Sequence, residues 1–158
     1  MRENIKEAEE ELKRADHLVY VTLKYTRTAD VIKNVISRLI NAFDLLILEA
    51  LEYAKKKRKI KEIPTNPVAK CEALVKVIKN KEILYYLKLY NLLKKIYKVE
   101  FLRKGEYRKN VALIALLPGK KFEVNMEKLR EFFEITKDFL FFIHDWVLGG
   151  KLRKQQDD

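Results

Sequence analysis

A single long segment, residues 29–57, places the strongest constraint on how this chain folds. Its apolar side chains recur at spacings of three and four residues without a break, which is the period of one broad face of an α-helix. So wide a face predicts burial against several neighbours, as in the central helix of a bundle. The apolar positions are Val31, Ile32, Val35, Ile36, Leu39, Ile40, Phe43, Leu46, Ile47, Ala50, Leu51 and Ala54.

Four other segments also have a helical period. Glycine (4) and proline (3) are scarce among the 158 residues, which favours long uninterrupted elements. Thr28, Asn66 and Asn125 stand where N-cap residues are preferred. The pair Gly149-Gly150 predicts the end of the last helix, because glycine often follows a helix C-terminus. The four segments are residues 3–23, 67–79, 81–103 and 126–148.

The pattern changes between Val111 and Asn125. This stretch, VALIALLPGKKFEVN, predicts two short strands around a turn at Pro118-Gly119. The predicted fold is therefore mainly α, an antiparallel helical bundle of about five helices with one inserted β-hairpin. We expect a single helical domain over residues 1–150 and a polar C-terminal tail over residues 151–158.

The composition favours a cytoplasmic protein. The single cysteine, Cys71, cannot form an internal disulfide, and the chain starts without a signal peptide. No apolar run approaches the length of a membrane span, so we expect no membrane partner. Abundant Lys, Glu and Ile are typical of proteins from heat-loving organisms.

The net charge of +11 indicates a polyanion partner such as RNA, because binding phosphates releases counterions. The alternative is a lysine-rich surface that only keeps the protein soluble. The densest basic cluster follows the long helix, where cations also stabilise the helix dipole. Its members are Lys55, Lys56, Lys57, Arg58, Lys59 and Lys61.

A second basic region is interleaved with the aromatic residues Tyr97, Phe101 and Tyr107. Aromatic rings beside Lys and Arg suit single-stranded nucleic acid, through base stacking and phosphate contacts. Tyr97 and Phe101 also fit the period of a helix core, which is the competing interpretation. The basic residues are Lys94, Lys95, Lys98, Arg103, Lys104, Arg108 and Lys109.

A third candidate is a polar groove between segments 3–23, 29–57 and 126–148. It would combine the first interhelical junction with the polar stripe of the long helix. Buried polar groups need partners, so these side chains either line a groove or satisfy one another against neighbouring helices. The residues are Lys24, Tyr25, Arg27, Arg38, Asn41 and Asp44.

The stretch KDFLFFIHDW, residues 137–146, contains one of the two histidines. Lys137 and His144 share a helix face, whereas the adjacent Asp145 does not face His144, so the pair is no built-in dyad. We interpret His144 mainly as a residue at the edge of the core. With two histidines and one cysteine, and without a glycine-rich phosphate loop, we expect no metal and no cofactor.

The order of helices resembles the HEPN superfamily. The similarity rests on the opening EAEEELKRADHL, the very long second helix and the late aromatic-rich helix. The resemblance implies an antiparallel bundle, often dimeric, that binds or cleaves RNA without a metal. Its nucleases carry Arg, four to six residues, then His; here Lys137 and His144 are the closest match. Lysine lacks the bidentate donors of arginine, so nuclease activity is the weaker implication.

Three functions follow as hypotheses. The first is a non-catalytic module that binds RNA or a ribonucleoprotein through clustered Lys and Arg. The second is a divergent HEPN-like endoribonuclease that uses Lys137 and His144. The third is a homodimer or other protein-interaction module with no nucleic-acid role, for which the apolar surface candidates are Tyr85, Tyr86, Phe141 and Phe142.

Overall fold

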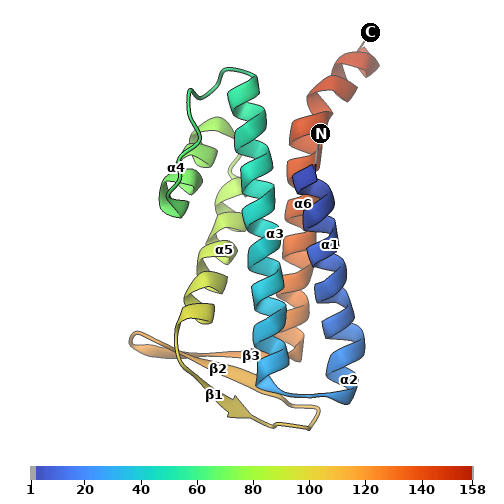
Figure 1. The fold of residues 1–158 in the computed structure, drawn as a ribbon, viewed down its shortest axis with the longest axis vertical. Coiled ribbons are helices and arrows are strands. Elements are labelled where there is room, and N and C mark those ends of the chain that lie inside the picture. Colours follow the sequence, from blue (N-terminus) through green and yellow to red (C-terminus); the bar gives the residue numbers. More distant parts are fainter. Residues whose placement is uncertain (1–2, 158) are drawn as a thin grey trace.

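The computed structural model describes residues 3–157, and its account of side chains covers residues 3–149. The fold is mainly α-helical with a small antiparallel sheet, as predicted. Helix α1 (Glu3–His17) passes through a π-helical turn, η1 (Leu18–Thr22), into the short α2 (Leu23–Tyr25). This rod runs antiparallel to the central helix α3 (Ala29–Lys56), as Figure 1 shows.

The second half of the chain covers the other side of α3. Helices α4 (Pro67–Val77) and α5 (Glu82–Lys98) precede three strands, β1 (Phe101–Lys104), β2 (Ala112–Leu117) and β3 (Lys120–Asn125). Helix α6 (Met126–Asp157) then returns along the bundle. The strands lie at the end of the bundle where α3 begins, and the α3–α4 connection lies at the opposite end (Figure 1).

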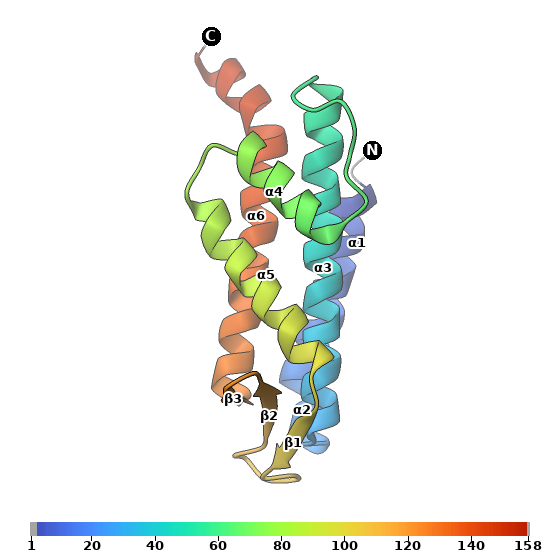
Figure 2. The same cartoon turned by 90° about the vertical axis from the view of Figure 1, so that its left-hand side faces the viewer.

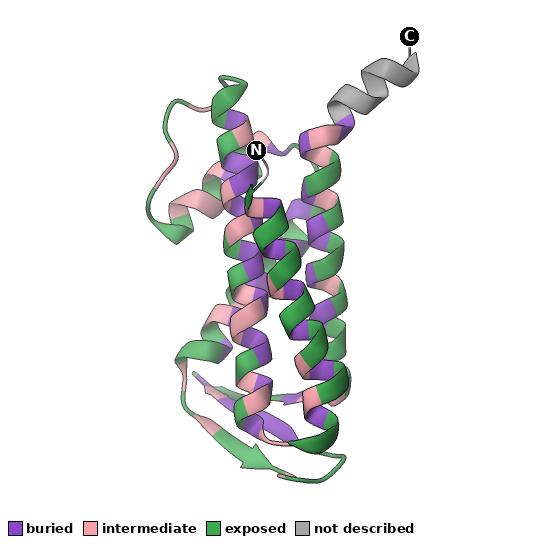
Figure 3. Cartoon of the chain, turned by 45° about the vertical axis from the view of Figure 1, so that its right-hand side comes forward, coloured by how far each residue is buried: buried purple, intermediate pink, exposed green. Residues whose placement is uncertain are grey.

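The core surrounds α3, which packs against α1, α4, α5 and α6. Buried residues of all these helices face inward, and the exposed residues form the outer surface (Figure 3). Phe43 of α3 is fully buried, with its ring centroid 4.8 Å from that of Phe139 and 5.5 Å from that of Tyr90. This aromatic cluster joins α3, α5 and α6.

The three predicted N-caps are confirmed. The Thr28 hydroxyl accepts a hydrogen bond from the Val31 amide at 3.3 Å. The Asn66 side chain accepts from Val68 at 2.7 Å, before Pro67 at the first helical position. Asn125 accepts from the Lys128 amide at 2.8 Å. Each cap supplies an acceptor to an amide that has no partner inside its helix.

Two predicted boundaries are wrong. The fourth helix ends at Lys98 rather than Arg103, because Phe101–Lys104 form a strand that pairs with β2. The expected hairpin is therefore part of a three-stranded sheet, in which Phe101 lies opposite Ala115. Helix α6 does not end at Gly149-Gly150. Gly149 lacks the positive φ of a C-terminal glycine cap, so the helix continues to Asp157 through most of the expected tail.

Among the described residues, no helix combines the length and the apolar character that crossing a membrane requires.

Candidate nucleic-acid interface

The two predicted basic regions lie at opposite ends of the bundle. Lys55–Lys59 stand where α3 ends, whereas Arg103–Lys109 belong to the sheet end, where α3 begins (Figure 1). Helix α3 has 28 residues, and its length is about 42 Å at a rise of 1.5 Å per residue. Lys55–Lys59 and Arg103–Lys109 therefore do not form one patch.

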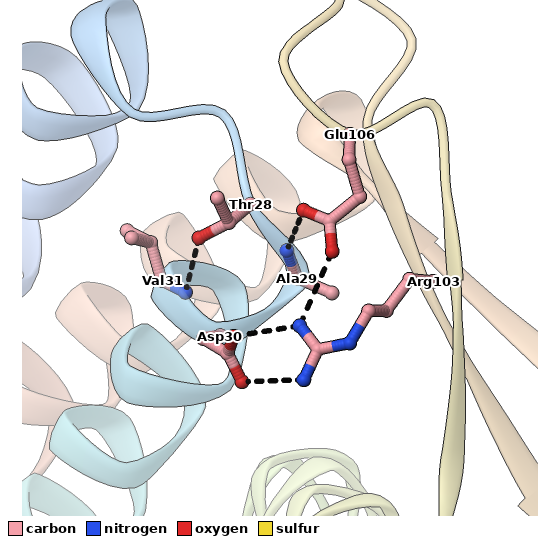
Figure 4. A network of polar contacts seen from close by, with 6 residues as sticks. All are labelled: Thr28, Ala29, Asp30, Val31, Arg103 and Glu106. Atoms are coloured by element: carbon pink, nitrogen blue, oxygen red, sulfur yellow. Dashed lines mark hydrogen bonds and ion pairs between the residues drawn. The ribbon is translucent and has the colours of Figure 1, made fainter.

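Much of the charge at the sheet end is engaged within the protein. The Arg103 guanidinium donates to both carboxylate oxygens of Asp30, at 2.6 and 3.1 Å, and to Glu106 at 3.2 Å (Figure 4). This bond to Arg103 lowers the pKa of the Asp30 carboxyl below its ordinary value. Lys104 pairs with Glu123 at 3.0 Å. Arg108 and Lys109 are exposed on the β1–β2 loop.

Two of the three aromatic residues of the same region, Tyr97 and Phe101, have a lysine over the ring, whereas Tyr107 is exposed. The Lys33 ammonium lies 4.9 Å from the ring centroid of Tyr97 and 5.4 Å from that of Phe101. The Lys94 ammonium lies 4.2 Å from the centroid of Tyr90. Lys94, Lys95 and Lys98 line a groove between α4 and α5 instead of joining the cations of the sheet end.

The opposite end of the bundle contains a cleft of about 1090 Å³ between the end of α3, α4 and α6. We call it the aromatic cleft. Tyr53 and Trp146 form its aromatic wall, with ring centroids 5.1 Å apart and planes at 74°. Both residues are half-buried. Its other lining residues include Lys59, Lys76, Lys79, Glu72, Phe142 and Asp145.

Lys59 connects the predicted basic cluster to this cleft. Its ammonium lies 5.2 Å from the ring centroid of Trp146, and that of Lys57 lies 5.8 Å from the centroid of Tyr53. Lys76 and Lys79 approach from α4 and the residues that follow it. Aromatic faces beside ammonium groups suit a stacked base and its phosphates, and Glu72 offers an acceptor for base amino groups.

Sequence reasoning missed Tyr53 and Trp146 as site residues. Both residues lie in segments with a helical period, where an aromatic side chain is typical of the core. The packing of α3 against α6 brings the two rings together from positions far apart in the chain. The only local signal was the run of lysines that begins two residues after Tyr53.

The predicted polar groove does not assemble. Arg38 pairs with Glu11 of α1 at 3.3 Å, whereas Asp44 accepts a hydrogen bond from the Tyr90 hydroxyl of α5 at 2.5 Å. These partners lie on different sides of α3, so the stripe is satisfied by two neighbouring helices. Lys24, Tyr25 and Asn41 are exposed, and the Arg27 carbonyl accepts from the Tyr107 amide at 2.6 Å.

Lys137 and His144 are both exposed on α6. They lie seven residues apart, about 10 Å along the helix axis. His144 is rotated by about 200° from Trp146 on a regular helix, so it belongs to a different face from the residues that line the aromatic cleft. Within the described residues, no three His, Cys, Asp or Glu side chains gather as metal ligands would.

The apolar surface candidates divide into two groups. Tyr85 and Phe141 are exposed. Tyr86 is buried and Phe142 half-buried, and their ring centroids lie 5.3 Å apart against the core cluster. Of these four residues, Tyr85 and Phe141 therefore present most of a side chain to a partner.

No family model, curated protein or solved structure matches the chain.

Proposed function

We propose that this protein binds single-stranded RNA without cleaving it, and that the aromatic cleft is the binding site. The observation that carries the proposal is the Tyr53–Trp146 pair with the Lys59 ammonium over the indole ring. One base stacks against the exposed ring surface, and Lys59, Lys76 and Lys79 contact the neighbouring phosphates.

The overall charge supports this assignment. A net charge of +11 attracts a polyanion over a long range, and the aromatic cleft gives that attraction a place where bases can stack. Stacking of one base on an aromatic side chain contributes about 1–3 kcal/mol. Each lysine–phosphate contact with a single strand steepens the slope of log K against log salt concentration by about 0.7. The HEPN-like order of helices is compatible with an RNA-binding bundle.

The test is a titration with a short single-stranded RNA at several salt concentrations. Trp146 is the chain's one tryptophan, so its intrinsic fluorescence reports on the aromatic cleft directly. We expect quenching on binding, and substitution of Lys59, Lys76 and Lys79 by Gln should reduce the slope of log K against log salt by about 2.

The matched control is Lys24→Gln, which removes one exposed lysine at the other end of the bundle. It should leave the fluorescence change intact and weaken binding only slightly. RNA binding that is insensitive to salt, or that survives the three cleft substitutions unchanged, would rule out the aromatic cleft as the site.

The same samples are run on a denaturing gel with EDTA present. Intact RNA is expected. Cleavage that disappears in His144→Ala would instead assign a HEPN-like ribonuclease activity to Lys137 and His144. If RNA does not bind and the mass in solution is that of a dimer, a protein-interaction role would replace the proposal.

A further inference from the structure

A second hollow, the α4–α5 groove, lies on the outer face that Figure 2 turns toward the viewer. It has a volume of about 770 Å³. In that view α4 and α5 run side by side in front of α6 and α3. The groove borders the aromatic cleft along α4, and the two hollows share the α4 residues Glu72 and Lys76.

The groove has an aliphatic floor that is open to solvent. Val68 of α4 is 63% exposed and Leu84 of α5 is 56% exposed, although both are apolar. Val75 and Leu87 line the groove between them. Positions 84, 87, 91, 94 and 98 of α5 recur at spacings of three and four, so the groove follows one stripe along that helix.

Lysines flank this floor. Lys76, Lys88, Lys94, Lys95 and Lys98 all line the groove, whereas Glu72 is the acidic residue among its lining side chains. The ammonium of Lys94, one of these lysines, lies 4.2 Å from the ring centroid of the buried Tyr90. The surface is therefore apolar in the middle and cationic along its rim.

We propose that the α4–α5 groove binds an acidic amphipathic helix of a partner protein. The groove between the two helices leaves room for a third, whose apolar face covers the aliphatic floor while its Glu or Asp residues meet the lysine rim. The α5 stripe from Leu84 to Lys98 is about 21 Å long, which matches roughly four turns of a partner helix. The proposal does not rest on the aromatic wall of the RNA site, although the two hollows share Glu72 and Lys76.

The chemistry of the groove disfavours other occupants. None of its lining residues is aromatic, so it offers no ring faces for nucleobases. A second copy of this chain has a net charge of +11 and would bring positive charge to a cationic rim. An acidic helix instead complements both the floor and the rim.

Cys71 provides a reporter inside the groove. It is half-buried, and burial raises the pKa of its thiol. As the chain's single cysteine, it makes the rate of alkylation by iodoacetamide a measure of access to this groove alone. The probe is a designed helical peptide with leucines along one face and glutamates on both flanks. Its control carries lysines in place of the glutamates.

The acidic peptide should bind, as measured by fluorescence anisotropy, and slow alkylation of Cys71 by at least about tenfold at saturation. The lysine peptide should do neither. Leu84→Glu puts a negative charge on an exposed position and should weaken peptide binding by about tenfold or more. Leu102→Glu, at a position 45% exposed in β1, is the matched control and should bind like the wild type.

Equal binding of the acidic and lysine peptides would overturn the proposal, as would wild-type affinity in Leu84→Glu or alkylation unaffected by bound peptide. Failure of the acidic peptide to bind at millimolar concentration would overturn it as well. These results are separate from those of the RNA titration, because Trp146 reports on the aromatic cleft and Cys71 on the groove.

Discussion

Glu106 ties the β1–β2 loop to the first residue of α3, and its removal should destabilise the whole bundle. One carboxylate oxygen accepts a hydrogen bond from the Ala29 amide at 3.2 Å, and the other accepts from Arg103 at 3.2 Å (Figure 4). Ala29 is fully buried and opens the central helix. Glu106 therefore acts as an additional cap, supplied by a loop far along the chain.

The expected magnitude follows from these contacts. In Glu106→Ala the Ala29 amide loses its acceptor, which costs about 1–3 kcal/mol for a buried group. Loss of a negative charge at a helix N-terminus adds about 0.3–1 kcal/mol. We expect a total of about 2 kcal/mol, which lowers the melting temperature by about 4–8 °C for a chain of this size.

The assay is thermal unfolding followed by far-ultraviolet circular dichroism. Glu106→Gln keeps a side-chain oxygen for the Ala29 amide and should recover part of the loss. The control Glu123→Ala removes the exposed partner of Lys104 and should cost no more than about 1 kcal/mol. If Glu106→Ala destabilises no more than Glu123→Ala, the capping argument is refuted. RNA affinity should not change, because Glu106 lies at the sheet end, away from the aromatic cleft.

Two further predictions concern the core. Burial, and then the hydrogen bond to Asp44, raise the pKa of Tyr90 above its ordinary value of 10.0. Above pH 10 the Tyr90 hydroxyl loses its proton in the unfolded state before it does so in the folded state. The free energy of unfolding should therefore fall by up to about 1.4 kcal/mol per pH unit. Tyr90→Phe should flatten this alkaline decline in urea titrations, and an unchanged slope would contradict the assignment. Phe43→Ala should cost about 3–5 kcal/mol, since it empties the centre of the aromatic cluster. A loss as small as that of Val21→Ala, at an exposed position, would show that the cluster is not central.

The fold was predictable where the signal was local. The apolar face of α3 and the caps at Thr28, Asn66 and Asn125 depend on residues within a turn of one another. Strand β1 was not predictable from the sequence, because Phe101 continues the apolar spacing of the preceding helix. Its extended conformation comes from pairing with β2, a contact that no local pattern encodes.

The candidate site shows the same limit. The lysines after α3 are visible in the sequence, and one of them, Lys59, lies in the aromatic cleft. The aromatic wall depends on where α6 passes the end of α3, which only the packing determines. Arg103 was expected to be available to nucleic acid, but it pairs with Asp30. Asp30 comes from a distant part of the chain, so no local pattern shows this pairing.

Helix α4 lies between the two hollows and has few buried residues. Within its 11 residues only Leu74 is buried, and Glu72 and Lys76 face both the aromatic cleft and the α4–α5 groove. These two side chains are part of the lining of both hollows. A ligand that moves Glu72 or Lys76 in one hollow would therefore change the affinity of the other, and by reciprocity the coupling factor would be the same in both directions.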